Sequence, residues 1–149
     1  MLKPTAIATA ISGTLDILFA MVLTVAFSRQ IPNMLRYVAS GPFPVATDMG
    51  MAGAVLGLLV HFALMGIMAA VLMVYLTSRP ENLERPILVG LVYGLITYVA
   101  MNLIVVPLRF DTPLPPKPLS IATQLFAHIA LVGIPMALVA RHYLRPRAA

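Results

Sequence analysis

Apolar residues fill four long segments of this chain on every helical face, at about 6–27, 50–76, 87–107 and 119–141. A helix needs about 20 mostly apolar residues to cross roughly 30 Å of hydrocarbon, and each segment is long enough. The length of the chain is enough for one compact bundle and no second domain. The pattern predicts an all-α membrane protein, with one transmembrane domain over 1–149 that forms a four-transmembrane-helix bundle.

Polar and helix-breaking residues collect between these segments, in SRQIPNMLRYVASGPFPVATD, TSRPENLERP and PLRFDTPLPPKP. These stretches are predicted to be loops outside the lipid, because unpaired backbone groups cannot face hydrocarbon. The proline-rich third stretch predicts an extended connection. In the first stretch, IPNMLRYVA is compatible with an interfacial helix whose Met34, Leu35 and Val38 face lipid, or with an ordinary ordered loop.

The first segment is expected to remain in the protein as a span, rather than to act as a cleaved signal peptide. Only Lys3 precedes it, and its apolar run is interrupted by Ser12, Gly13, Thr14 and Asp16. A signal peptide has a more basic start and an unbroken apolar core.

Composition supports a membrane protein, because 60% of the residues are hydrophobic and only 10% are charged, against about a quarter charged in soluble domains. The absence of cysteine excludes disulfides, thiolate metal sites and cysteine nucleophiles within this chain. The net charge of +5 is scattered, without a basic block interleaved with aromatics. The expected partner is therefore the lipid bilayer and not nucleic acid.

The distribution of basic residues predicts the orientation. Six of them lie at the N-terminus, in the second loop and at the C-terminus: Lys3, Arg79, Arg85, Arg141, Arg145 and Arg147. Four lie in the first and third loops: Arg29, Arg36, Arg109 and Lys117. Because basic residues stay on the cytoplasmic side, both termini of this multi-pass protein are predicted to be cytoplasmic.

A seven-residue motif occurs twice, as HFALMGI at 61–67 and HIALVGI at 128–134, with five identical positions. The spans that precede the two copies also align loosely, as 12–27 over 93–108. The chain is thus predicted to contain two pseudo-repeated helical hairpins, which would be parallel repeats about an axis along the membrane normal.

The repeated motif predicts polar groups in the middle of the membrane. His61 and His128 each lie about ten residues into spans that enter from the same side, and Asp16 lies at a similar depth. Gln124 is one helical turn before His128, and Asn102 is nearer the outer end of the third span. A charged aspartate at the centre of a span costs about 2.5–3.5 kcal/mol, and a histidine partner would remove that cost in a pH-sensitive way.

Several functions are compatible with these residues. The leading hypothesis is a non-enzymatic protein whose polar midplane site binds a small ligand, a proton or an ion, or supports assembly with a partner. In a second, His61 and His128 ligate haem b from both sides, with Asp16 or Gln124 orienting a ring and Gly57, Gly66 and Gly133 admitting the porphyrin. Another metal is a third hypothesis. In a fourth, the histidines only join helices in an accessory subunit of a larger membrane complex.

Glycine spacing predicts close helix contacts. Gly53 and Gly57 form a GxxxG pair, as do Gly90 and Gly94, and Gly66 and Gly133 belong to the repeated motif. Such pairs permit close approach of helix backbones. Packing within the bundle is expected ahead of packing in a homo-oligomer.

Enzymatic activity is not expected, because the motifs that carry common chemistry are missing. The sequence has no G-x-S-x-G, no phosphate-binding glycine loop and no carboxylate pair for acid–base catalysis, and its serines lie near no evident base. The ten methionines are dispersed, which is typical of packing and not of copper binding.

Five strings, read in order, resemble a family of small four-span bacterial inner-membrane proteins of unknown function. They are RYVASG (36–41), GLLVHF (57–62), RPILVGLVYG (85–94), MNLIVVPL (101–108) and HIALVGIPMALVAR (128–141). The resemblance covers nearly the whole chain and implies a four-helix fold in the bacterial inner membrane. The strings include His61, Asn102 and His128, but not Asp16. The resemblance carries no catalytic assignment.

Overall fold

Four long helices form the protein in a computed structural model that describes residues 1–145. Each is long and apolar enough to cross a membrane, which confirms the predicted all-α four-helix bundle and makes the chain an integral membrane protein. The first span is α1 (Leu2–Ala26) and the second is α3 (Gly50–Ser78). The third comprises α4 (Pro86–Tyr98), η3 (Val99–Val105) and α5 (Val106–Phe110). The fourth comprises α6 (Pro118–Phe126), η4 (Ala127–Gly133) and α7 (Ile134–Leu144).

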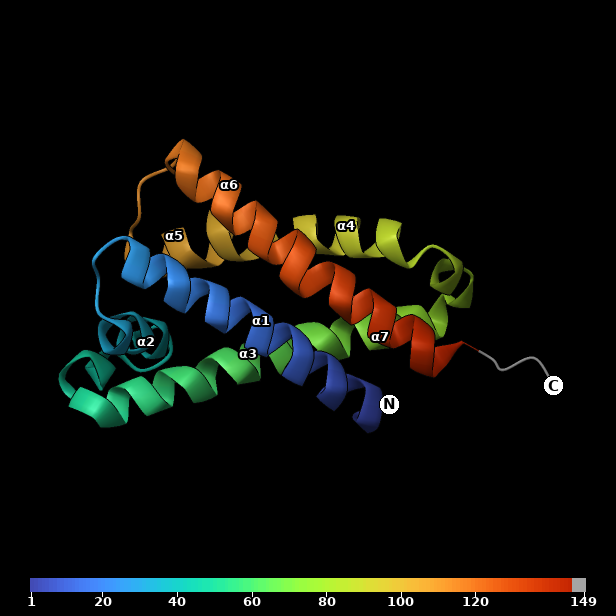
Figure 1. The fold of residues 1–149 in the computed structure, drawn as a ribbon, viewed down its shortest axis with the longest axis horizontal. Helices are drawn as coiled ribbons and strands as arrows, with labels where there is room; N and C mark the ends of the chain where they lie inside the picture. Colours follow the sequence, from blue (N-terminus) through green and yellow to red (C-terminus); the bar gives the residue numbers. More distant parts are fainter. Residues whose placement is uncertain (146–149) are drawn as a thin grey trace.

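The connections lie at two opposite ends of the bundle (Figure 1). One end, here called the terminal end, contains the N-terminus, the end of α7 and the short turn η2 (Pro80–Glu84). The other, here called the α2 end, contains α2 (Ile31–Ser40) and η1 (Pro44–Asp48). Residues 111–117 form no helix, as predicted for the proline-rich connection.

The interior is built from small side chains that let the helices come close. Ala8, Ala69, Ala137 and Ala140 are at most 1% exposed and pack with methionine and leucine side chains toward the terminal end. Only 22% to 33% of the residues in the most apolar stretch of each span are buried within the chain. The remaining apolar surface is suited to lipid, so the core depends on close packing and not on excluding apolar groups from water.

The stretch IPNMLRYVA forms the helix α2, which is one of its two interpretations, but Leu35 does not face lipid as that interpretation expects. Leu35 is buried and packs with Ile17 and Ala54 of the first and second spans. A Cβ added at Gly57 would overlap the backbone carbonyl of Leu35, and one at Gly53 would overlap that of Ala46. The first GxxxG pair therefore forms the surface on which α2 and η1 rest, and α2 is pressed against α3 rather than lying outward in the interface.

The second GxxxG pair lies where the third and fourth spans cross. A Cβ at Gly90 would be 2.6 Å from Cα of Ile134, and one at Gly94 would be 2.5 Å from the carbonyl oxygen of His128. A Cβ at Gly133 would overlap the backbone of Gly90. Both GxxxG pairs are thus occupied by elements of the same chain. Gly66 differs, because its nearest neighbour across the interface is the side chain of Thr9 at 3.8 Å.

The third and fourth spans each contain a seven-residue π-helical segment, η3 and η4. A proline follows two residues after each segment, as Pro107 and Pro135. Proline has no N–H to donate, and its ring clashes with the carbonyl four residues earlier, so the preceding backbone cannot keep regular i to i−4 bonding. A π segment accommodates the mismatch by moving to i to i−5 bonding. The same local sequence cause therefore acts in both spans.

Candidate functional site: polar networks in the membrane interior

His61 joins the second span to the first. Its Nε2 lies 2.9 Å from the carbonyl oxygen of Gly13, and the residue is only 7% exposed. Because a carbonyl can only accept, Nε2 must carry a hydrogen and donate it. Gly13 makes this approach possible, since a Cβ there would lie 2.7 Å from the ring of Phe62. A glycine on α1 thus opens the space that brings the histidine to the backbone.

Asp16 faces the other nitrogen of the same ring. Its Oδ2 lies 3.9 Å from Nδ1 of His61, and the two side chains are 19% and 9% exposed. That distance is longer than a direct hydrogen bond, so the two groups interact through charge. With Nε2 held as a donor to Gly13, any further proton must go to Nδ1 of His61 or to the Asp16 carboxylate. The predicted Asp–His pair is therefore present, and its two facing groups can share one further proton.

His128 lies in a different and fully bonded network. The Thr97 hydroxyl lies 3.0 Å from the carbonyl oxygen of Gly94 and can only donate to it. Thr97 Oγ1 then accepts from Nδ1 of His128 at 3.1 Å. The remaining nitrogen, Nε2, accepts from the Asn102 amide at 3.1 Å. This arrangement describes a neutral imidazole with both nitrogens engaged.

The His128 network connects the two π segments. Asn102 belongs to η3 and His128 to η4, and the ring of Tyr98 meets the imidazole edge-on with centroids 6.1 Å apart. A second polar contact reaches η4 from the first span, where Ser12 Oγ donates to the carbonyl oxygen of Val132 at 3.3 Å. Side chains from two spans therefore bond to the segment in which regular helical bonding is interrupted.

The two histidines lie at nearby depths but in separate networks. The first and fourth spans run antiparallel, since Ser12 bonds to Val132 and the ring of Phe19 lies 5.3 Å from that of Phe126. This register puts His128 opposite residue 17, and His61 bonds to Gly13. Four residues of helix correspond to about 6 Å, so the levels differ by roughly one turn. Within residues 1–145, however, no hydrogen bond or ring contact joins His61 to His128.

This geometry does not fit haem held by both histidines. Each ring would have to offer an unengaged nitrogen to the same iron. Nε2 of His61 and both nitrogens of His128 already have partners within the chain. Over the part of the chain that the structure describes, no three His, Cys, Asp or Glu side chains gather in a way that could hold a metal ion.

Among the described residues, Gln124, a predicted site residue, joins neither network, whereas Thr97 bonds to His128 and Ser12 bonds to the segment η4. Gln124 lies one turn before His128 and is half-buried, but makes no side-chain hydrogen bond to it within residues 1–145. The sequence did not indicate that Thr97 and Ser12 would form these hydrogen bonds. Thr97 precedes Asn102 by five residues, which is the hydrogen-bond spacing of a π helix and not of an α-helix. The sequence signal for the His128 network was therefore a threonine and an asparagine five residues apart, followed by a proline.

The comparisons with known proteins add no assignment. No protein-family model, curated protein or solved structure that was compared with this chain matches it. The resemblance to a family of small four-span proteins therefore stays a prediction, as does the internal repeat. The local structures of the two motif copies differ, since His61 lies in the regular helix α3 and His128 in the π segment η4.

Proposed function

We propose that this integral membrane protein is non-enzymatic and that its Asp16–His61 pair binds and releases one proton in the interior of the membrane. The observation that carries the proposal is the Nε2 bond from His61 to Gly13, which leaves Nδ1 facing the Asp16 carboxylate. A carboxylate and an imidazole that share one site in a low-dielectric interior form a group that changes charge with pH. Of the ligands that the sequence suggested, namely a small molecule, a proton or an ion, the proposal selects the proton.

The surroundings of the pair support binding of a single proton. The other ionisable residues on α1, on α3 and on the elements that pack against them lie mostly at the ends of the bundle, namely Lys3, Arg36, Tyr37, Asp48, Tyr75, Glu81, Glu84, Arg141, His142 and Tyr143. The exception is His128, whose two nitrogens are bonded to Thr97 and Asn102. Among the described residues, Asp16 is the acidic partner of His61 within ion-pair distance. The charge state of the pair therefore depends on its own proton.

Infrared titration of the protein in lipid nanodiscs tests this proposal. The chain has five carboxylate side chains, and the four others, Asp48, Glu81, Glu84 and Asp111, are exposed in the connections. We expect a protonated-carboxyl band in a dry environment that appears on acidification and is lost in Asp16→Asn. His61→Gln keeps a donor for Gly13 but cannot take up a proton, and we expect it to shift the titration of this band.

Asp111→Asn is the matched control, because it removes an exposed carboxylate and should leave the interior band unchanged. A band that persists in Asp16→Asn would contradict the proposal. So would a titration that is the same in His61→Gln as in the unsubstituted protein.

The proposed setting is a bacterial inner membrane, with both termini in the cytoplasm. The support is the excess of basic residues at the terminal end, where Lys3, Arg79, Arg85, Arg141 and Arg145 outnumber the two glutamates Glu81 and Glu84. Basic residues near span ends favour the cytoplasmic side. Cysteine labelling of Ser78→Cys and Ser120→Cys in intact cells tests the orientation, since the protein has no cysteine of its own. Labelling of Ser120→Cys alone by an impermeant reagent is the expected result.

A second candidate function is that of an accessory subunit whose polar residues only join helices. The complete bonding of His128 within its own chain favours this interpretation for that network. It predicts co-purification with a larger complex in mild detergent. It also predicts that substituting His61 or Asp16 lowers stability equally at every pH, whereas proton binding predicts a pH-dependent effect.

A further inference from the structure

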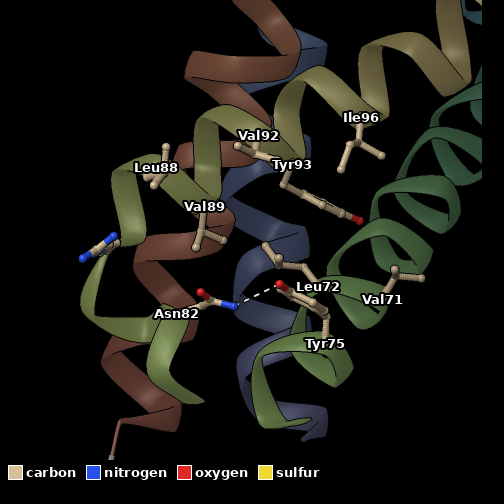
Figure 2. Close-up of a pocket in the computed structure, with 10 residues that line it drawn as sticks. Val71, Leu72, Tyr75, Asn82, Leu88, Val89, Val92, Tyr93 and Ile96 are labelled. Carbon is tan, nitrogen blue, oxygen red and sulfur yellow. Dashed lines mark hydrogen bonds between the residues drawn. The ribbon is translucent and has the colours of Figure 1, made fainter. Parts of the chain in front are cut away.

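A groove opens on the outer surface of the connection between the second and third spans, and is bounded by the last turns of α3, the turn η2 and α4 (Figure 2). Its volume is about 490 Å³. The wall is apolar and is formed mainly by Val71, Leu72, Leu88, Val89, Val92 and Ile96. The groove begins at Val71, ten residues after His61 on α3, and shares no lining residue with the Asp16–His61 pair.

The length of the groove matches one leaflet of a bilayer. It extends from Arg85, just before α4, to Ile96 inside that helix. Eleven residues of helix correspond to about 16 Å, which is close to half of a hydrocarbon core of about 30 Å. Val92 and Ile96 are 51% and 56% exposed, so the wall faces the lipid along its length. An acyl chain of the same leaflet could lie in it without leaving the bilayer.

Two tyrosines contribute rings to the wall while their hydroxyls are bonded elsewhere. Tyr93 donates its hydroxyl hydrogen to the carbonyl oxygen of Met68 at 2.6 Å. Tyr75 accepts a hydrogen bond from the Asn82 amide at 2.9 Å, at the mouth of the groove (Figure 2). The inner part of the groove therefore presents apolar ring surface, and the polar groups collect at its mouth.

Within residues 1–145, the mouth of the groove carries one positive charge that has no acidic partner. Glu81 lies 4.0 Å from Arg79, and Glu84 lies 2.9 Å from Arg145. Both acidic residues of η2 thus have basic partners, while Arg85 has none within residues 1–145. Arg85 is exposed and lines the groove. A guanidinium at this level is suited to a phosphate group, which it can bind through two parallel hydrogen bonds.

We propose that this groove binds one anionic glycerophospholipid of the adjacent leaflet. Its phosphate lies against Arg85, and one acyl chain lies along the wall formed by Val89, Val92 and Ile96. Charge complementarity favours this occupant, since the terminal end is basic and attracts anionic headgroups. A second copy of the chain would instead bring a like-charged Arg85 and its basic neighbours toward the same surface.

Native mass spectrometry of the purified protein tests the proposal, with phosphatidylglycerol and phosphatidylcholine of the same acyl chains added in equal amounts. We expect one phosphatidylglycerol to remain bound at detergent concentrations that remove phosphatidylcholine. Arg85→Gln should weaken retention of phosphatidylglycerol about fivefold, as expected for one arginine near an anionic group. Val92→Trp should abolish retention by filling the wall, with Leu88→Trp as a second variant at the mouth.

The chain offers matched controls. Arg79→Gln removes a basic residue from the same connection, but one that is paired with Glu81. Val74→Trp adds the same bulk at a valine that is 60% exposed and outside the groove. Both should retain phosphatidylglycerol. Equal retention of the two lipids, or equal loss in Arg79→Gln and Arg85→Gln, would overturn headgroup recognition. Unchanged retention in both tryptophan variants within the groove would overturn the site itself.

Discussion

The Asn102 amide donates a hydrogen bond to Nε2 of His128 across 3.1 Å, and this bond joins the π segments of the third and fourth spans. Each segment precedes a proline, so the two helices are irregular at the level where they are linked. The link also determines the state of the imidazole. With Nε2 accepting from Asn102 and Nδ1 donating to Thr97, His128 is neutral and has no nitrogen left for a ligand.

Asn102→Leu should destabilise the protein, because it leaves Nε2 of His128 without a donor in the membrane interior. Interhelical hydrogen bonds in membranes contribute about 0.6 kcal/mol on average and up to about 1.7 kcal/mol. We expect a loss near the upper value, measured as the free energy of unfolding in mixed micelles. Gln124→Leu is the control, since Gln124 makes no bond to His128 within the described residues, and it should change that free energy by less. Equal effects would argue against the network.

Gly57→Ala should displace α2 from the second span. The added methyl group would overlap the carbonyl of Leu35, which belongs to the backbone and can move only with the helix. Overpacking of this kind costs about 1–3 kcal/mol. Faster hydrogen exchange over Ile31–Ser40 should report the displacement. Gly66→Ala adds the same methyl group 3.8 Å from Thr9, an ordinary contact, and we expect it to leave exchange in α2 unchanged.

Gly13→Ala should separate the first and second spans and weaken the His61 bond. The new methyl group would lie 2.7 Å and 2.9 Å from two carbons of the Phe62 ring. We expect a lower melting temperature, together with a changed ¹⁵N shift of His61 Nε2. The double variant Gly13→Ala with Phe62→Leu removes the opposing ring and should recover much of both changes. Failure to recover either would show that Gly13 is needed for another reason.

Arg109→Gln should loosen the C-terminal end of α2. The guanidinium donates to the carbonyl oxygens of Gly41 at 2.6 Å and Ser40 at 2.8 Å; Ser40 is the last residue of α2 and Gly41 follows it. Hydrogen bonds from charged donors contribute about 1.5–3 kcal/mol. Limited proteolysis near residues 40–43 should become faster, and Lys117→Gln, in the connection that follows α5, should have no such effect. Unchanged cleavage in Arg109→Gln would contradict the capping role.

Much of the fold follows from the sequence because lipid imposes strict conditions on it. The four apolar segments are long enough to span the bilayer, and their predicted bounds agree with the observed helices to within a few residues. The polar residues of the interior could also be identified one by one, since an Asp, a His or an Asn stands out among apolar neighbours in the sequence. That Asp16 pairs with a histidine could be predicted because few other polar partners lie at that depth, but the structure was needed to show that this histidine is His61.

Partner choice within the interior could not be predicted, because it depends on how the helices rotate about their own axes. Periodicity does not determine that rotation when a span is apolar on all faces. His61 therefore bonds to α1 and His128 to the third span, although their motifs are nearly the same. Leu35 likewise faces α3 and not lipid, because the two glycines of the first GxxxG pair admit α2.

The sequence by itself determined that this protein crosses a membrane four times and carries ionisable groups inside it, because length, hydropathy and burial cost can be read along one helix. Only the tertiary structure decided which of those groups meet, since contacts between spans depend on close packing at small residues. The groove beside Arg85 is a similar case, as its wall comes from two spans and its charge from the pairing of neighbouring glutamates.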